Sequence, residues 1–222
     1  MIVIATNNGH VYLEKTLSKL SELGNKIPIS IIDTNSTDNQ TINFISDIDN
    51  GLYPNLNIST HQTPYRGFDT GAYIYAMKYI YSDKYYFIHD SFLIKTLDFI
   101  DSIDDLLKEG TVISTLDFDS GIYDNNEQIE FCLEKVGTSQ YERGIFGPMF
   151  SILRCDVDKI IKSLNFYPTT KNFQMAMERA WPIIFKTNNI NVVSLCGSLD
   201  MNKMQSDGYK FFTKFLPHRD YK

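Results

Sequence analysis

The chain has 222 residues, of which 43% are hydrophobic, 22% are charged and 14% are aromatic. These values are typical of globular proteins and exclude a largely disordered or collagen-like chain. The net charge of −6 excludes a broad basic surface of the kind that binds nucleic acid or anionic membranes. A phosphate group would therefore have to be bound locally, by backbone amides, a metal ion or one or two cations.

Cysteine usage and hydropathy indicate a soluble, cytoplasmic protein. The three cysteines, Cys132, Cys155 and Cys196, are odd in number, far apart and form no CxxC pattern, as expected of reduced thiols. No run reaches the ~18 apolar residues of a membrane-spanning helix, and the N-terminal residues lack the features of a secretory signal. We expect neither a nucleic-acid partner nor an integral membrane segment.

Apolar, β-prone runs alternate with helical patterns in the first ninety residues. Strands are predicted at 2–5, 28–32, 56–58 and 85–88. Helices are predicted after the first strand, from leucines at 13, 17 and 20, and over 69–81. This strand–helix rhythm with short turns predicts an α/β protein with a parallel sheet.

Three polar clusters follow these strands directly. They are Thr6-Asn7-Asn8, Asp33-Thr34-Asn35-Ser36 and His89-Asp90-Ser91. In parallel α/β sheets ligands bind beyond the carboxyl ends of the strands. We therefore expect one crevice that is assembled from three separate places in the sequence.

The second half is less regular. Helical patterns are predicted around 99–106, 157–164 and 173–184, and strands at 112–116, 129–134, 145–153 and 190–195. No linker or composition break divides the chain, so we expect one domain over residues 1–222. Its nucleotide-binding half would cover 1–95 and its substrate-binding half 96–197, followed by a tail or lid at 198–222.

The short polar residues of the crevice admit two interpretations. The Asp33 carboxylate is suited to bind a base imide or a ribose hydroxyl, and equally to cap the turn that follows it. The side chains of Thr6, Asn8, Asn35 and Ser36 likewise suit either turn formation or nucleotide contacts.

The segment 65–73 contains two glycines at a predicted helix start. Free amides at Gly67 and Gly71 would attract phosphate, and Arg66 could add a charge-assisted contact. The spacing matches neither a dinucleotide-binding GxGxxG motif nor a Walker loop. The alternative is a capped helix with a close-packed Gly71.

Candidate metal ligands are few. Asp90 follows a predicted central strand and suits a metal ion or a sugar hydroxyl, whereas Ser91 is a poor ligand for a hard cation. Asp117 and Asp119 form a DxD triplet in a later loop, where a structural or acceptor-facing role is favoured. His218, in the tail, is a candidate for a late metal or phosphate ligand, or is simply solvated.

Glu178 is the candidate general base. Pro182 cannot donate a helical hydrogen bond to the Glu178 carbonyl, which predicts a helix that begins near Met177. Glu178 would then lie at a helix N-terminus beside a substrate pocket. The alternative is an exposed glutamate that pairs with Arg179 or Lys171.

The order of these motifs resembles family 2 glycosyltransferases with the A-type nucleotide-sugar fold. Residues 2–8 are similar to the opening strand of that family, and 31–38 (IIDTNSTD) to its v-D-n-x-S-x-D segment. Residues 66–73 (RGFDTGAY) followed by 86–91 (YFIHDS) resemble most the rhamnan-synthesis F branch, which carries G-x-D-x-G and then N-D-S. Residues 147–150 resemble the acceptor-side strand, and Glu178 the motif that supplies the base.

The resemblance covers residues 2–195 and implies a single-domain three-layer sandwich with a mostly parallel mixed sheet. It implies a hexosyl- or deoxyhexosyl-transferase that uses a nucleotide-diphosphate sugar in glycan or polysaccharide synthesis, with inversion. The implied nucleotide-sugar contacts are Thr6, Asn8, Asp33, Asn35, Ser36, Arg66, Gly67, Asp69, Gly71, Asp90 and Ser91. Glu178 would be the base, and Asp90 and His218 would hold Mg²⁺ or Mn²⁺ if a metal binds.

The sequence departs from the family at two points. Aspartates at both ends of the metal triplet are replaced by His89 and Ser91, and the glutamate/aspartate pair is Glu178-Arg179. Metal dependence and the identity of the base therefore stay open. The alternatives are a nucleotidyltransferase, which would need the glycine-rich loop and lysine that residues 6–10 lack, and a non-catalytic carbohydrate- or nucleotide-binding module.

Overall fold

The computed structural model describes residues 1–65, 68–206 and 208–214. Three residues that the sequence suggests as ligands, Arg66, Gly67 and His218, lie outside the described residues. None of the helices in the described part of the chain is long and apolar enough to cross a membrane.

A seven-stranded mixed sheet forms the centre of the molecule, with the strand order β10-β6-β9-β4-β1-β2-β3. Its strands are β1 (Ile2–Thr6), β2 (Ile29–Asp33), β3 (Ile58–Gln62), β4 (Lys84–His89), β6 (Thr111–Ser114), β9 (Phe150–Leu153) and β10 (Asn191–Ser194). All neighbours are parallel except β9, which runs antiparallel to both β4 and β6. The expected α/β class and mostly parallel mixed sheet are confirmed.

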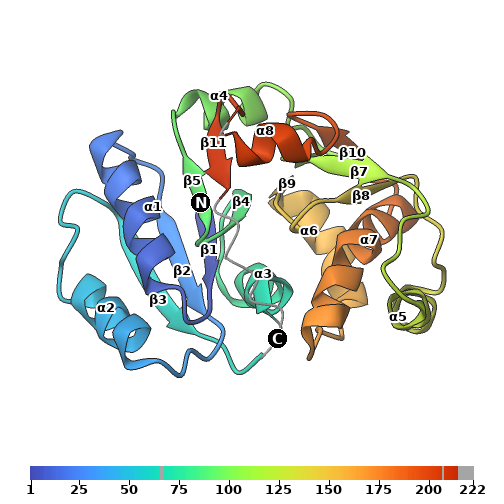
Figure 1. Cartoon of the computed structure of the whole chain (residues 1–222), viewed down its shortest axis with the longest axis horizontal. Coiled ribbons are helices and arrows are strands. Elements are labelled where there is room, and N and C mark those ends of the chain that lie inside the picture. The colour runs from blue at the N-terminus through green and yellow to red at the C-terminus, as the bar shows by residue number, and fades with distance from the viewer. Residues whose placement is uncertain (66–67, 207, 215–222) are drawn as a thin grey trace.

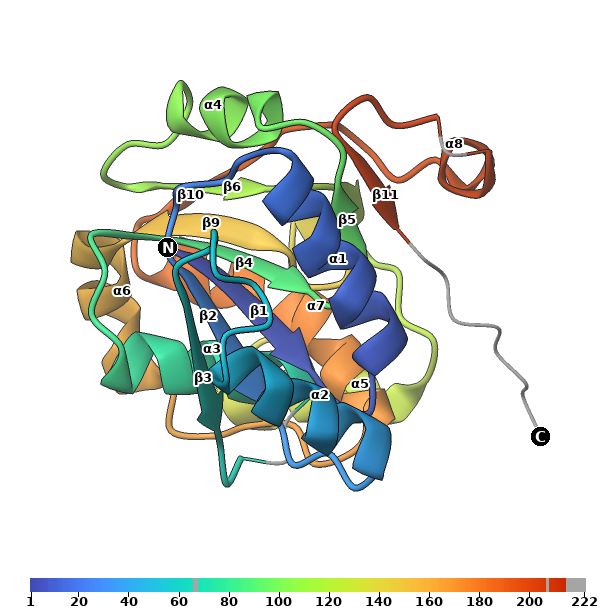
Figure 2. The ribbon, with the colours of Figure 1, turned by 90° about the vertical axis from the view of Figure 1, so that its left-hand side faces the viewer.

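Helices cover both faces of this sheet, which gives three layers (Figures 1 and 2). One face packs on α1 (His10–Glu22), α2 (Asn39–Asp49), α4 (Asp98–Asp104) and α8 (Met201–Gln205). The other packs on α3 (Phe68–Tyr79), α5 (Asn126–Val136), α6 (Arg154–Ile160), the 3₁₀ turn η1 (Ile161–Ser163) and α7 (Lys171–Thr187). Successive strand residues point to opposite faces, so Ile2 and Ile4 join the first core and Val3 and Ala5 the second.

Two small sheets flank the central one. β5 (Phe92–Ile94) pairs with β11 (Phe212–Lys214), and β7 (Asp117–Asp119) pairs with β8 (Arg143–Ile145). In the first pair, the buried rings of Phe92 and Phe212 stack with their centroids 4.6 Å apart. This contact brings part of the expected tail back to the segment that follows β4 (Figure 1).

The predicted strand at 129–134 is wrong, because these residues lie inside α5. The Asn125 side chain accepts a hydrogen bond from the Gln128 amide (3.2 Å), and Gly137 ends the helix in the left-handed conformation. Such caps satisfy backbone groups that a helix leaves open. The expected strand at 145–153 is also divided, since Gly147 adopts a φ of +54° between β8 and β9.

The predicted start of the helix around Met177 is also wrong. α7 begins at Lys171, where the Thr170 hydroxyl accepts a hydrogen bond from the Phe173 amide (3.2 Å), and it continues through Pro182. An internal proline costs about 3 kcal/mol, whereas full burial of one large apolar side chain contributes about 1.5–3 kcal/mol. The burial of Trp181 and Phe185 offsets that cost, so Glu178 lies in mid-helix.

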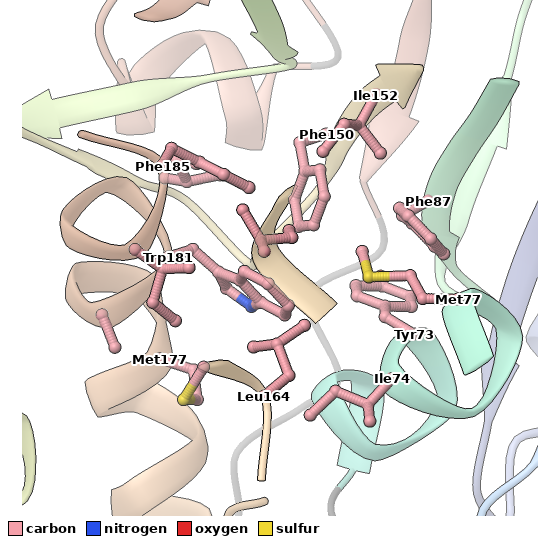
Figure 3. Close-up of a cluster of buried hydrophobic side chains, with 14 of the residues drawn as sticks. Tyr73, Ile74, Met77, Phe87, Phe150, Ile152, Leu164, Met177, Trp181 and Phe185 are labelled. Carbon is pink, nitrogen blue, oxygen red and sulfur yellow. The ribbon is translucent and has the colours of Figure 1, made fainter. Parts of the chain in front are cut away.

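An aromatic cluster fixes α3 against α7 below the sheet (Figure 3). The centroid of the Tyr73 ring lies 4.6 Å from that of Phe87 and 5.9 Å from that of Phe150. The centroid of the Phe150 ring lies 5.0 Å from that of Trp181. Side chains from four elements, α3, β4, β9 and α7, interlock here in a densely packed interior. The cluster therefore determines which side chains of α3 and α7 meet at the edge of the sheet.

Candidate active site

The strand register brings the three polar clusters to one edge of the sheet. β4, β1 and β2 are adjacent and parallel, so Thr6 lies beside Asp33 and Ala5 beside His89. The Thr6 hydroxyl donates a hydrogen bond to Oδ2 of Asp90 (2.8 Å). Residues 6–8, 33–36 and 89–91 thus border the same part of the molecule.

Hydrogen bonds within this edge shape its loops. Oδ1 of Asp33 accepts from the Ser36 amide (2.9 Å) and hydroxyl (2.6 Å), and the Asn8 amide donates to the Ser36 hydroxyl (2.8 Å). Asn8 and Asn35 have φ angles of +53° and +71°, a region that asparagine tolerates better than most residues. In this structure Asp33, Asn8 and Ser36 therefore stabilise turns, one of the two interpretations that the sequence left open.

These loops border a pocket of about 250 Å³. Its lining residues are Asn7, Asn8, Thr34, Asn35, Thr37, Phe68 and Thr169. The ammonium group of Lys171 lies 5.7 Å from the centre of the Phe68 ring. The pocket thus presents amide and hydroxyl groups together with one aromatic face, which suits a small polar ligand with a flat ring.

The glycine of the α3 segment is close-packed. A Cβ atom at Gly71 would lie 2.8 Å from the Tyr65 carbonyl oxygen, so a larger residue would displace the chain there. Asp69 lies in the first turn of α3. Gln174 of α7 reaches this turn, since its Nε2 donates to Oδ2 of Asp69 and its Oε1 accepts from the Thr70 amide, both at 3.4 Å.

An ammonium group occupies the His89-Asp90-Ser91 triplet. Nζ of Lys214, from β11, lies 2.8 Å from Nδ1 of His89 and 2.7 Å from Oγ of Ser91. Because lysine only donates, Nδ1 is the acceptor and the ring proton is on Nε2. Nε2 of His89 lies 3.0 Å from Oδ2 of Asp69. The N–H bond is not directed at this oxygen, so Nε2 has no hydrogen-bond partner among the described residues.

Burial shifts the pKa values of this cluster. It lowers the pKa of Lys214 to about 8, against the charges of Asp69 and Asp90, so this ammonium stays mostly protonated at neutral pH. It raises the pKa of Asp90 to about 6, against the Thr6 hydrogen bond and the Lys214 charge. Burial and the nearby lysines hold the pKa of His89 well below its usual range, so the imidazole is neutral.

Glu178 lies on α7 and is linked to the His89 region through Gly147, where a Cβ would be 3.2 Å from Cε1 of His89. Its Oε1 accepts from the Gly147 amide (3.0 Å) and its Oε2 from Nη1 of Arg179 (2.9 Å). Burial raises the pKa of Glu178, while Arg179 and the Gly147 amide oppose the rise. The pair with Arg179 that the sequence suggested does exist, but it is mostly buried, since the two side chains are 17% and 5% exposed.

The described residues do not fit a divalent cation. They contain no group of three or more His, Cys, Asp or Glu side chains arranged to hold a metal ion. Asp90 is bonded to Thr6 and lies so close to the Gly9 backbone that a Cβ there would be 1.9 Å from Oδ2. The positive charge of Lys214 on His89 and Ser91 opposes a second cation at that position.

The second candidate metal triplet, Asp117-Phe118-Asp119, contains an aspartate that forms an ion pair with the exposed Arg143. Oδ2 of the buried Asp117 accepts from Nη1 of Arg143 (2.6 Å) across the β7–β8 pair. Sequence reasoning favoured a structural or acceptor-facing role for Asp117 and Asp119, and the ion pair supplies a structural one. Sequence reasoning missed Lys214 and Gln174, because only the pairing of β11 with β5 and the packing of α7 on α3 bring them here.

The architecture is the A-type glycosyltransferase fold. Similar structures include TarS of S. aureus, with a TM-score of 0.51 and 15% identity over 97% of this chain and 36% of that chain. The mannosyltransferase PcManGT of Pyrobaculum calidifontis, in complex with GDP-Man and Mn²⁺, has a TM-score of 0.58 and 12% identity over 87% and 53%. The galactosyltransferase LgtC, in complex with donor and acceptor sugar analogs, has a TM-score of 0.51 and 15% identity over 87% and 72%.

These similarities establish the fold of the chain. The chain spans 36% of the length of TarS and 53% of that of PcManGT, so it corresponds to part of each protein. The amino-acid sequence matches no protein-family model and no curated protein.

Proposed function

We propose that the chain is a glycosyltransferase that moves a sugar from a nucleotide-diphosphate sugar to a hydroxyl group of an acceptor. One observation carries this proposal: on an A-type glycosyltransferase fold, a polar pocket and a cluster of buried charges meet at the carboxyl edge of the sheet. This is the edge at which open α/β sheets bind ligands. The similar structures include complexes with GDP-Man and with donor and acceptor sugar analogs.

The donor would lie along this edge. We assign the nucleoside to Thr6, Asn8, Asp33, Asn35 and Ser36, supported by the pocket that Asn8 and Asn35 line. We assign the diphosphate and the donor sugar to Arg66, Gly67, Asp69, Gly71, Asp90 and Ser91. The first assigned set adjoins the second through the Thr6–Asp90 hydrogen bond, so one extended ligand is able to contact both.

Glu178 is the proposed base. Its carboxylate would take the proton of the acceptor hydroxyl as that oxygen attacks the anomeric carbon from the face opposite the diphosphate, which gives inversion. Base catalysis of this kind contributes roughly 10²–10⁴-fold. Burial raises the pKa of Glu178, which makes the carboxylate a stronger base than an exposed glutamate.

The test is turnover of a panel of UDP-, GDP- and dTDP-sugars with hydroxyl acceptors, followed by the Glu178→Gln variant. We expect this variant to lose transfer by roughly a hundredfold or more and to keep its affinity for the nucleoside diphosphate. Glu134→Gln is the matched control, because Glu134 lies exposed on α5 and pairs only with its neighbour Lys135 among the described residues. Unchanged transfer in Glu178→Gln would refute the base assignment.

One observation favours a non-catalytic binding module as the second candidate. Both oxygens of Glu178 already accept hydrogen bonds, from Gly147 and Arg179, which leaves the base less available to an acceptor. Calorimetry with nucleoside diphosphates separates the two candidates. Binding without transfer or hydrolysis of any donor would establish the module.

The narrower assignments rest on the sequence motifs. The resemblance to the rhamnan-synthesis F branch supports a hexose or deoxyhexose donor and a role in glycan or polysaccharide synthesis. We also propose that residues 1–95 bind the donor and 96–197 the acceptor. The free thiols of Cys132, Cys155 and Cys196 support a cytoplasmic location.

A further inference from the structure

The ammonium group of Lys214 lies on His89 and Ser91, in the triplet that the sequence resemblance compares with a metal triplet. Two of its N–H groups point to Nδ1 of His89 and Oγ of Ser91. Among the described residues, the third N–H has no hydrogen-bond acceptor. A partly buried charged donor with an unused hydrogen loses free energy unless water or a ligand completes its shell, so this N–H is open to an anionic ligand.

A second observation at the same place also points to a ligand. The His89 side chain is about nine-tenths buried, and its Nε2 has no hydrogen-bond partner among the described residues. Buried polar atoms of this kind are rare in native proteins and call for an explanation. The ring proton is on Nε2, so this atom is a donor. Oδ2 of Asp69 lies 3.0 Å away but makes no hydrogen bond to it, which leaves the proton open to an oxygen of a bound ligand.

The fold holds Lys214 in this position by a non-local strand pair. β5 begins at Phe92, directly after the triplet, and the antiparallel register places Lys214 opposite Phe92. The stacked rings of Phe92 and Phe212 anchor this register. The last described strand, β11, therefore supplies Lys214 to the site.

We propose that Lys214 is the cation that binds the diphosphate of the donor, and that it replaces the divalent metal ion in this chain. This inference rests on the proposed function and names the group that neutralises its leaving diphosphate. No hydrogen bond joins Asp90 to the ammonium among the described residues, and Oδ2 of Asp90 instead accepts from Thr6 and packs on the Gly9 backbone, so Asp90 acts on Lys214 through its charge alone. Lys171, the other lysine whose charge acts on Asp69 and Glu178, adds positive potential on the α7 side.

The chemistry balances without a metal ion. The bond between the anomeric carbon and the diphosphate oxygen breaks, and its electron pair stays on that oxygen. The acceptor oxygen forms the new bond to the anomeric carbon, and its proton passes to Glu178. Lys214 transfers nothing, because its role is to stabilise the negative charge that grows on the leaving oxygen.

The decisive measurement is calorimetry in EDTA with UDP and GDP, and with uridine and guanosine as probes that lack the diphosphate. We expect the unmodified protein to bind a diphosphate without metal. We expect Lys214→Met to weaken that binding by about tenfold to a hundredfold and to leave nucleoside binding unchanged. Lys214→Arg should restore part of the affinity, and Lys210→Gln, an exposed lysine of the same segment, should have no effect.

The outcomes distinguish this inference from the proposed function. Diphosphate binding that requires Mn²⁺ or Mg²⁺, or a Lys214→Met variant that binds as tightly as the unmodified protein and only melts earlier, would overturn the inference even if sugar transfer is found. Lys214-dependent binding without transfer from any donor would overturn the proposed function and support the inference. No nucleotide binding in either condition would overturn both.

Discussion

At the scale of single residues, the chemistry depends on a few close approaches to the backbone. Gly9 allows the Asp90 carboxylate to lie against the chain, and Gly71 allows α3 to lie against Tyr65. Neither glycine has a positive φ, so close packing rather than backbone conformation selects the residue at both positions.

We expect Gly9→Ala to displace Asp90. The added methyl group would lie 1.9 Å from Oδ2, and overpacking of this kind costs about 1–3 kcal/mol of stability. Urea denaturation and diphosphate calorimetry would measure the loss of stability and the weakened binding. Gly208→Ala is the control, because its added Cβ atom would lie 3.4 Å from its nearest neighbours, an ordinary van der Waals contact. Equal stability of the two variants would contradict the prediction.

The pH dependence of binding should follow Lys214. The charged groups that act on it are Asp69, Asp90, Lys171 and Glu178, and the neutral His89 accepts its hydrogen bond. Because the pKa of Lys214 is lowered to about 8, the cation is present below that pH and is lost above it. Diphosphate affinity in EDTA should therefore fall as the pH rises through about 8.

The arginine variant provides the control for this pH profile. Arginine stays protonated throughout this range, so the profile of Lys214→Arg should be flat where that of the unmodified protein declines. Parallel profiles for the two proteins would show that another group is responsible.

At the scale of secondary-structure elements, two elements position the site and neither could be placed from local sequence. α7 begins after the Thr170 cap and continues through Pro182, so both Gln174 and Glu178 lie within this helix. β11 carries Lys214 because it pairs with β5. In both cases distant contacts outweigh the local signal.

The cap of α7 is testable by itself. Thr170→Ala removes the acceptor for the Phe173 amide and should lower the free energy of unfolding by about 1 kcal/mol. Thr170→Ser keeps the hydroxyl and should retain most of this stability. Chemical denaturation measures both variants, and an equal loss for the two would assign the effect to the methyl group instead of the hydrogen bond.

The docking of β11 should be required for diphosphate binding. Phe212→Ala removes a fully buried ring that stacks on Phe92 and on Tyr209, and such truncations cost about 3–5 kcal/mol. We expect the variant to lose diphosphate affinity as Lys214→Met does, with faster proteolysis confined to the end of the chain. Phe211→Ala, at the neighbouring and less buried position, should bind the diphosphate nearly as the unmodified protein does.

At the scale of the whole molecule, the two predicted halves contribute to both hydrophobic cores, one on each face of the sheet. β4 from the first half pairs with β9 from the second, and Tyr73 and Phe87 pack on Phe150 (Figure 3). The two halves can differ in what they bind, but this packing leaves neither with a complete core.

We therefore expect a single cooperative unfolding transition. Trp181, the one tryptophan of the chain, is fully buried against Phe150, so its fluorescence reports on one of these shared cores. In urea its transition should coincide with the loss of helical circular dichroism, as two-state unfolding requires. Separate transitions, or a folded fragment of residues 1–95, would contradict shared cores.

Local sequence patterns were sufficient to predict the α/β class, the positions of the first strands along the chain and the polar residues at their ends. Runs such as 2–5 are apolar at every position because both faces of the strand are covered, and polar turn residues follow each strand at once. These signals are local, and they are sufficient to predict that residues 6–8, 33–36 and 89–91 share one edge.

Which charged side chains lie at that edge depends on tertiary contacts. The position of Lys214 on His89 and Ser91 depends on a strand pair between residues more than a hundred positions apart. The mid-helix position of Glu178 depends on burial that offsets a proline. Such contacts have no local sequence signal, because their free energy arises only when distant segments exclude water together.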